Sequence, residues 1–221
     1  CSSDLACSSA SLCRAVGESG ADLTSRRTMV QRWNGTAMAV VPSPNPPGAT
    51  TSNLVGISCS AATTCRAVGS SYSSSSSVTR GLVERWNGSN WAIPSSPNPS
   101  GAVSTVLRGV ACSSSSSCWA VGWFQGRAPR PVLMRWNGSA WSLSAAPVIE
   151  GPGATAFSDV ACPAATTCIA VGTTGHDEAY DPTDRHRAFV ARLVGSTWES
   201  VTAPTPIGAD ESYLEGVSCP S

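Results

Sequence analysis

A repeated arginine–tryptophan step is the first feature of this sequence that could do chemistry. An arginine recurs at the same point of four related segments, and in three of them a tryptophan follows directly. The residues are Arg32, Arg85, Arg135 and Arg192, with Trp33, Trp86 and Trp136. Planar guanidinium groups and aromatic rings suit sugars and acidic groups, so one interpretation is a row of ligand-binding sites. The interpretation we favour is structural: the arginine stems cover tryptophan faces between neighbouring segments, and Trp141 and Trp198 also serve packing.

Two variable stretches could also bind a ligand. Residues 176–186 gather both histidines and four carboxylates, and Asp177, Asp181 and Asp184 form a weak candidate Ca²⁺ site, because Ca²⁺ tolerates irregular oxygen ligands. The ligand order of an EF-hand is absent, so a solvated loop without metal is favoured. Trp123 and Arg127 combine an aromatic ring with a cation, and variable loops on a repeated frame are where recognition usually lies.

No sequence pattern is typical of a catalytic centre. The motifs G-x-S-x-G and H-E-x-x-H and the glycine-rich phosphate loops are absent. Glycosidase chemistry would need two facing carboxylates, for which Glu84, Asp159 and Glu215 are the available candidates. We therefore expect neither catalytic residues nor a cofactor, and we expect that the protein is not an enzyme.

Charge and hydropathy exclude several classes of partner. The formal net charge is zero, and every basic residue is arginine. A neutral chain attracts phosphate backbones and anionic lipids weakly, so nucleic acid is not an expected partner. No apolar run approaches the roughly eighteen residues of a membrane-spanning helix, so no transmembrane segment is predicted.

The cysteines point to an oxidising compartment and predict local disulfides. Four pairs have the form C-x5-C followed by x-A-V-G, a spacing that does not suit zinc ligands. Short apolar segments flank each pair, so a disulfide would tie two antiparallel strands at the mouth of their hairpin. The predicted bridges are Cys7–Cys13, Cys59–Cys65, Cys112–Cys118 and Cys162–Cys168. The expected location is secreted or at the cell surface.

The cysteine pairs also mark a repeat of about fifty residues. Each repeat holds four strand-like segments: one before the first cysteine, one after the second, and two around a turn. Asn-Gly pairs at 34/35, 87/88 and 137/138 predict hairpins in which both turn residues have positive φ. The fourth copy keeps only the glycine of this pair.

Four strands in fifty residues are typical of one propeller blade. The sequence thus predicts an all-β protein, a β-propeller of four-stranded antiparallel blades with four full repeats plus one extra strand and one hairpin disulfide per blade. It forms a single domain over 1–221, with repeats at about 1–53, 54–106, 107–156 and 157–213 and a fifth beginning at 214–221. A solenoid or a row of separate modules is the alternative.

The extra strand leaves Cys219 without the partner that its repeat position implies. Three interpretations stay open. Cys1 and Cys219 form a bridge, or the chain is a segment of a longer propeller, or Cys1 is the acylated first residue of a lipoprotein.

The recurring words C-x5-C-x-A-V-G, L-V-E-R-W-N-G-S-x-W and P-S-P-N-P resemble the repeats of secreted actinobacterial β-propeller proteins over nearly the whole chain. That resemblance implies a fold but no single activity. A second resemblance, to small fucose-binding propeller lectins, implies a site made of an arginine, a glutamate and aromatic rings. Only the second repeat offers this set, as Arg66, Glu84 and Trp86 or Trp91.

The function expected from these features is a non-catalytic, secreted or cell-surface β-propeller that acts as a binding or adhesion module. Its partner would be an extracellular glycan or protein. Alternatives are a structural protein that self-associates through its repeats and a carbohydrate-binding lectin, with a glycoside hydrolase as the least favoured.

Overall fold

The computed structural model describes residues 2–126, 128–149, 154–175 and 185–219, which form sixteen β-strands and no helix. Each repeat folds into one antiparallel sheet of four strands in chain order, which we call a blade. The first blade comprises β1 (Ser2–Ser9), β2 (Leu12–Ser19), β3 (Arg27–Trp33) and β4 (Met38–Val41). The second comprises β5 (Thr51–Ala61), β6 (Thr64–Ser73), β7 (Val78–Trp86) and β8 (Trp91–Ala92). The third comprises β9 (Ser104–Ser114), β10 (Ser117–Gln125), β11 (Pro129–Trp136) and β12 (Trp141–Ser144). The fourth comprises β13 (Thr155–Ala164), β14 (Thr167–Thr174), β15 (Arg187–Val194) and β16 (Thr197–Val201). The prediction of an all-β fold with four-stranded antiparallel blades is confirmed.

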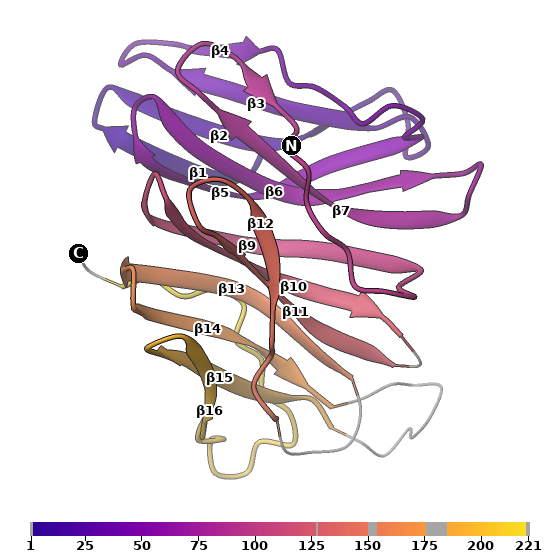
Figure 1. The fold of residues 1–221 in the computed structure, drawn as a ribbon, viewed down its shortest axis with the longest axis vertical. Helices are drawn as coiled ribbons and strands as arrows, with labels where there is room; N and C mark the ends of the chain where they lie inside the picture. Colours follow the sequence, from indigo (N-terminus) through magenta and orange to yellow (C-terminus); the bar gives the residue numbers. More distant parts are fainter. Residues whose placement is uncertain (1, 127, 150–153, 176–184, 220–221) are drawn as a thin grey trace.

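The blades lie one after another in chain order, from the first at the top of Figure 1 to the fourth at the bottom. Their inner strands β1, β5, β9 and β13 are neighbours in space. One parallel bridge, between Thr79 of β7 and Ser104 of β9, also joins the second blade to the third.

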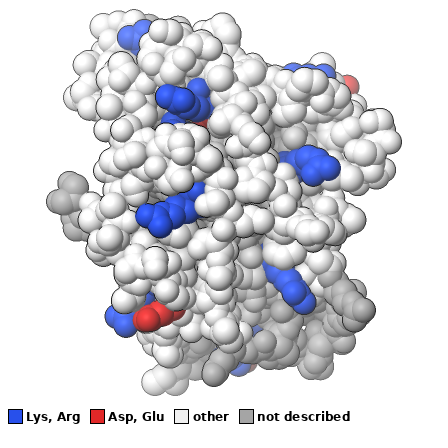
Figure 2. Space-filling model, viewed as in Figure 1, with Lys and Arg blue, Asp and Glu red and all other residues white. Residues whose placement is uncertain are grey.

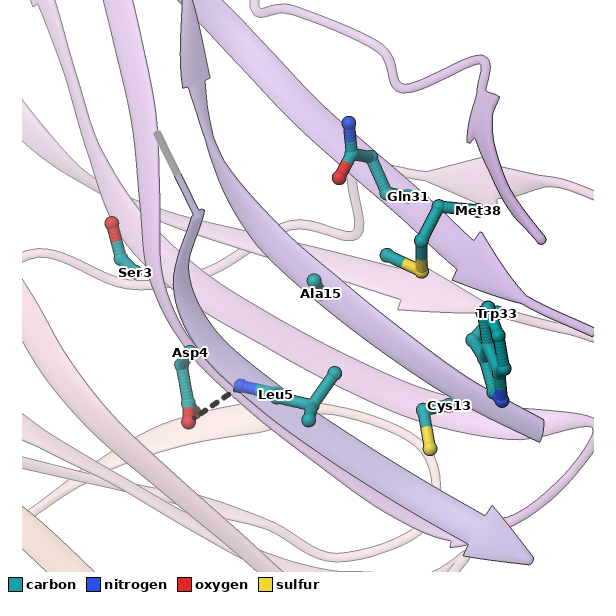
Figure 3. A pocket seen from close by; sticks show the side chains of 8 residues that line it. All are labelled: Ser3, Asp4, Leu5, Cys13, Ala15, Gln31, Trp33 and Met38. Atoms are coloured by element: carbon teal, nitrogen blue, oxygen red, sulfur yellow. Dashed lines mark hydrogen bonds between the residues drawn. The ribbon is translucent and has the colours of Figure 1, made fainter. Parts of the chain in front are cut away.

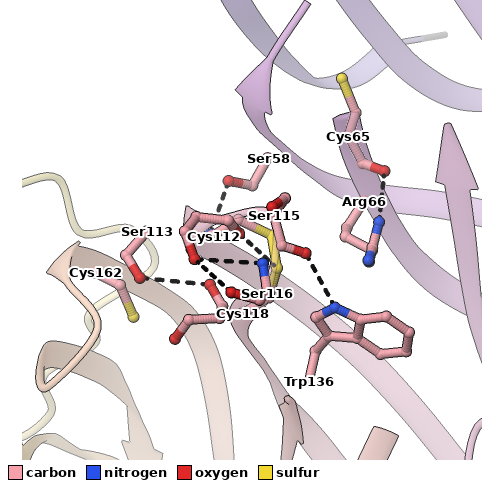
Figure 4. The surroundings of a disulfide bond; sticks show 12 residues. Ser58, Cys65, Arg66, Cys112, Ser113, Ser115, Ser116, Cys118, Trp136 and Cys162 are labelled. Atoms are coloured by element: carbon pink, nitrogen blue, oxygen red, sulfur yellow. Dashed lines mark hydrogen bonds between the residues drawn. A yellow bond between two sulfur atoms is a disulfide. The ribbon is translucent and has the colours of Figure 1, made fainter. Parts of the chain in front are cut away.

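All four predicted hairpin disulfides are confirmed. The cysteines face each other across the first two strands of each blade, with Cα–Cα distances of 3.9, 4.0, 4.0 and 4.1 Å. Figure 4 shows the bridge Cys112–Cys118 where β9 ends and β10 begins; there the Cys112 amide donates to Ser58 Oγ of the second blade (3.0 Å). The disulfide region therefore also contacts the preceding blade.

The glycine of the x-A-V-G motif is required by a bulge in the opposite strand. The register of the inner strand shifts by one residue beside this position in the second, third and fourth blades. A Cβ on Gly69, Gly122 or Gly172 would approach a carbonyl oxygen of that strand closer than 3.0 Å. Only glycine leaves room for the bulged strand.

The Asn-Gly turns differ from the prediction in one respect. Gly35 has a φ of +97°, but Asn34 does not have a positive φ, so positive φ at both positions was wrong. The loop holds four residues between the paired Trp33 and Met38. Asn34 acts through its side chain instead, because its Oδ1 accepts the amides of the residues two and three positions later, at 3.0 and 2.9 Å.

The core is divided among the three contacts between blades. One apolar cluster lies between the first and second blades, one between the second and third, and one between the third and fourth. Their centres are formed by Val16, Val30 and Leu54; by Val68, Val83 and Leu107; and by Val121, Leu133 and Phe157, respectively. Each blade therefore has two apolar faces, and each face is buried only where another blade lies against it.

The predicted extra strand forms no β-ladder within the described part of the chain. Residues 211–219 instead lie against the fourth blade, where the Val217 amide donates to Asp159 Oδ2 (2.9 Å) and the Ser212 amide to the His186 carbonyl (3.0 Å). A strand ladder needs a second strand beside it, and no described segment takes that place. Cys219 is a half-buried free thiol, and Cys1, its proposed partner, lies outside the described residues.

Charged side chains are scattered singly over the face shown in Figure 2, without a continuous basic patch. In the described ranges, no helix is long and apolar enough to cross a membrane.

Candidate functional site

One face of the first blade carries an open and largely apolar depression. Leu5 of β1, Cys13 and Ala15 of β2, Gln31 and Trp33 of β3, and Met38 of β4 line an open depression of about 570 Å³, together with Ser3 and Asp4. Figure 3 shows Leu5, Ala15, Trp33 and Met38, which lie on the four neighbouring strands β1, β2, β3 and β4. We call Leu5, Cys13, Ala15, Gln31, Trp33 and Met38 the first-blade face.

The positions of Leu5 and Met38 are buried in the other three blades. Leu5 is 56% exposed, whereas its counterparts Ile57, Val110 and Val160 are 5%, 6% and 4% exposed. Met38 is 45% exposed, whereas the tryptophans at its position are 4%, 6% and 3% exposed. These tryptophans are Trp91, Trp141 and Trp198. The first-blade face thus has the composition of a blade contact but lacks the covering blade in this structure.

In the second, third and fourth blades, a residue of the preceding blade covers the equivalent face. It is the residue directly after the second cysteine, and it points away from that cysteine because side chains alternate along a strand. The guanidinium carbon of Arg14 lies 4.8 Å from the centre of the Trp86 ring, and that of Arg66 lies 4.5 Å from the centre of the Trp136 ring. In the third contact an aromatic side chain replaces the arginine, and Trp119 packs edge-on against Trp198 with centroids 5.2 Å apart.

These contacts correct the structural role predicted for the strand arginines before tryptophan. Arg32, Arg85, Arg135 and Arg192 are exposed and do not separate the blades. The guanidinium carbon of Arg135 lies 5.8 Å from the centre of the Trp119 ring in the same blade. Arg192 forms an ion pair with Glu199, with 3.4 Å between Nη2 and Oε2. In each blade the strand arginine is the cross-strand partner of the residue that follows the second cysteine. The two side chains therefore lie on the same face, but the strand arginine is one strand nearer the outer edge of the blade.

The residues that do separate the blades, Arg14 and Arg66, are buried cations. Burial, with a smaller contribution from the nearby charge of Arg85, lowers the pKa of Arg66 to about 10. Burial first, and then the charge of Arg32, also lower the pKa of Arg14. Sequence reasoning missed this role, although one signal was present: the residue after the second cysteine is large in all four copies, as Arg14, Arg66, Trp119 and Ile169.

The set suggested by the lectin resemblance is not brought together. Glu84 pairs across the sheet with Ala67, whereas Arg66 pairs with Arg85, so the glutamate and Arg66 project from opposite faces of the second blade. Trp86 and Trp91 share the face of Glu84, with ring centroids 5.8 Å apart. A single ligand therefore cannot contact both Arg66 and Glu84 across the sheet.

Glu84 is fully buried at the contact between the first and second blades. Its Oε2 accepts a hydrogen bond from Ser43 Oγ (2.8 Å), and its Oε1 has no hydrogen-bond partner. Burial raises the pKa of Glu84 to about 7, and the hydrogen bonds from Ser43 and Thr28 oppose that rise. The corresponding residue of the third blade is Met134, which shows that the position accepts an apolar side chain.

The remaining candidates do not form a second site. Trp123 lies in β10, half-buried and paired with Pro131, while Arg127 lies outside the described residues. Asp177, Asp181 and Asp184, the Ca²⁺ candidates, also lie outside them. Among the residues that are described, no cluster of histidine, cysteine or carboxylate side chains could hold a metal ion.

Two of the glycosidase candidates meet at the inner strands. Asp159 and Glu215 line a polar cavity of about 190 Å³ with Asp4 and Arg108. Asp4 Oδ2 accepts the Ile57 amide (2.7 Å), and Asp159 accepts the amides of Val160 (2.8 Å) and Val217 (2.9 Å). Burial raises the pKa of Asp159, with a smaller contribution from the charge of Asp4, while its hydrogen bonds act against the rise. Asp4 thus joins β1 to β5, whereas Asp159 joins β13 to the C-terminal residues 211–219.

Comparison with known proteins places the fold but not the family. No protein-family model matches the chain, and no curated protein matches its sequence. Among solved structures the chain is similar to the GH74 xyloglucanase from Xanthomonas campestris, with a TM-score of 0.52 and 16% sequence identity. The fold is that of a β-propeller. The match covers 90% of this chain and 29% of that structure, so this propeller segment spans less than a third of the protein that it resembles.

Proposed function

We propose that this chain is an extracellular, non-catalytic propeller module that binds protein through its first-blade face. The observation that carries the proposal is the exposure of Leu5 and Met38 at positions that are almost completely buried in the other three blades. An apolar patch that is buried wherever the repeat has a neighbour is typical of an interaction surface.

The chemistry of the face favours a protein over a sugar. It presents an aliphatic side chain, a thioether, an aromatic ring and a disulfide, and its neutral hydrogen-bonding groups are the amide of Gln31 and the indole N–H of Trp33. The equivalent surfaces of the other blades pack against valine and leucine side chains of a neighbouring blade. The four disulfides support an extracellular location, because such bridges persist in oxidising compartments.

Two features support a role without catalysis or sugar recognition. Arg66 and Glu84 lie on opposite faces, so the lectin-like set has no shared pocket. The carboxylates of Asp4 and Asp159, on the inner strands β1 and β13, accept hydrogen bonds from main-chain amides. Because the similar structure is a xyloglucanase, xyloglucan is the appropriate probe for the opposing hypothesis.

The test immobilises the chain on a sensor surface and presents two analytes, a second copy of the chain and xyloglucan oligosaccharides. We expect capture of the second copy, its loss in Leu5→Asp, and neither binding nor hydrolysis of xyloglucan. Leu23→Asp is the matched control, since Leu23 is also an exposed leucine but lies on the loop after β2. Hydrolysis of xyloglucan, or failure to capture the second copy, would contradict the proposal.

A further inference from the structure

We propose that the disulfide Cys59–Cys65 is a thiol-exchange site, at which a low-molecular-weight thiol attacks Cys59 and releases Cys65 as a thiolate. The bridge lies in the contact between the first and second blades, where Cys65 belongs to the apolar cluster and Cys59 packs against it. Both blades of this contact are present, so the inference does not depend on the first-blade face.

A buried cation lies against the inner sulfur of this bridge. Cys65 is fully buried, and Nη1 of Arg14 in the first blade donates to its Sγ at 3.8 Å. Arg14 is 4% exposed, and within the described part of the chain no carboxylate forms an ion pair with it. Burial, and then the charge of Arg32, lower the pKa of Arg14, as expected for a cation without a counter-charge. A thiolate at Cys65 would supply that negative charge, because opposite charges attract strongly where water is excluded.

The other three disulfides differ in this respect. Their second cysteines are also buried, so a thiolate there would lose its hydration without gaining a counter-charge. These cysteines are Cys13, Cys118 and Cys168. At the next contact Arg66 takes the place of Arg14, but its Nη1 donates to the Cys65 carbonyl (3.4 Å). Among the described residues, Arg14 is the only charged side chain that donates to a cysteine sulfur. Cys59–Cys65 therefore has the most stabilised leaving group of the four bridges.

The exposure of the two sulfurs sets the direction of attack. Cys59 is half-buried, whereas Cys65 is out of reach of solvent. The incoming thiolate forms a bond to Cys59 Sγ, the Cys59–Cys65 bond breaks, and its electron pair goes to Cys65 Sγ beside Arg14. A second thiolate can then attack the mixed disulfide, which releases Cys59 to take up a proton and leaves the two small molecules joined in a disulfide. Exchange is faster when the leaving thiolate is more stable, so Arg14 should accelerate the first step.

The test measures exchange on the folded chain with reduced glutathione as the probe. Samples are quenched with an alkylating reagent and digested, and mass spectrometry locates the attached glutathione. We expect Cys59–Cys65 to exchange about fivefold faster than Cys112–Cys118 and Cys162–Cys168, whose first cysteines are also half-buried. The glutathione should be attached to Cys59 and not to Cys65.

Substitution of Arg14 separates the effect of its charge from that of its packing. Arg14→Met removes the charge and keeps a long side chain, so exchange at Cys59–Cys65 should slow about fivefold. Loss of packing alone would have the opposite effect, because a looser contact exposes the bridge. Arg14→Lys keeps the charge and should exchange faster than Arg14→Met. Arg66→Met is the matched control, because it removes a buried arginine at the next contact and should not slow exchange at Cys112–Cys118.

Near-ultraviolet circular dichroism confirms that each variant is folded. Equal rates at the three compared bridges, attachment of glutathione to Cys65, or an Arg14→Met variant that exchanges as fast as the wild type would each overturn the inference. Should Arg14→Met fail to fold, the rates of the three bridges in the wild type and the position of the attached glutathione still decide. Preferential attachment at Cys59 that depends on the charge of residue 14 establishes the site.

Discussion

The first and last contacts between blades solve the same packing problem with different chemistry. Between the first and second blades, Arg14 lies over Trp86, and the buried carboxyl of Glu84 accepts from Ser43. Between the third and fourth blades, Trp119 and Trp198 meet edge to face, and Phe157 and Phe189 pack with centroids 5.0 Å apart. The blades therefore share one backbone fold, and two or three side chains decide whether the buried contact between them is polar or apolar.

The difference has an energetic consequence. Burial of an aromatic pair is favourable at any pH, whereas a buried carboxyl is tolerated best when it is neutral. We therefore expect the last contact to contribute most to stability and the first contact to respond most to pH. Chemical denaturation of variants at the two contacts distinguishes these contributions.

The largest effect is expected for Trp198→Ala. Trp198 is buried in the last apolar cluster, and removal of a buried tryptophan typically costs about 4 kcal/mol of unfolding free energy. Urea denaturation followed by circular dichroism measures the change. Trp33→Ala, on the first-blade face, is the control and should cost about 1 kcal/mol or less. Equal losses for the two variants would contradict the assignment of the first-blade face as uncovered.

The second effect concerns Glu84→Met, which places the residue of the third blade at this position. The carboxyl of Glu84 titrates near 4.5 in the unfolded chain and near 7 in the folded chain, so the folded state holds more protons between these values. Its contribution to stability is therefore greatest below pH 4.5, falls as the pH rises to 7, and is constant above that.

The methionine cannot lose a proton, so the stability of the variant should increase relative to that of the wild type as the pH rises. The difference in unfolding free energy between variant and wild type should increase by about 3 kcal/mol across this interval. Denaturation at several pH values measures it, and a difference that does not vary with pH would show that Glu84 is not buried as a neutral acid. Met134→Leu in the third blade is the pH-independent control.

Much of this architecture could be predicted from the sequence, because it depends on local, repeated signals. Cysteine spacing identified the hairpin disulfides, and apolar segments identified four strands per repeat. The fold class followed from both. These signals act within one blade, where residues close in sequence are also close in space.

The contacts between blades could not be predicted in the same way. Which face of a strand meets a neighbour depends on the strand's register, and a shift of one residue reverses every side chain. For that reason Arg32 and its equivalents were given a role that Arg14 and Arg66 fill, and Arg66 was grouped with Glu84 although the two project from opposite faces. The exposure of Leu5 was equally hidden, since its sequence neighbourhood matches that of buried residues.

An intermediate effect is expected for Arg66→Ala. The variant loses the buried arginine stem and its contact with Trp136, at a cost of about 2 kcal/mol in unfolding free energy. Arg85→Ala is the matched control in the same blade, because Arg85 is exposed and its charge disfavours the Arg66 cation. That control should change stability by about 0.5 kcal/mol or less. The reverse order of effects would restore the role first assigned to the strand arginines.

The smallest effect is expected for Met38→Trp, which gives the first blade the tryptophan that the other three carry. A tryptophan stabilises this position elsewhere because a neighbouring blade buries it, and Trp91, Trp141 and Trp198 are all buried. No described segment covers Met38 in this way, so the exchange should change the unfolding free energy of dilute protein by about 0.5 kcal/mol or less. At high concentration the larger side chain should raise the apparent stability, because association binds only the folded state. Thermal unfolding at two concentrations separates these cases. A clear gain in dilute solution would mean that another part of the chain already covers the first-blade face, and that face would then not be a free binding surface.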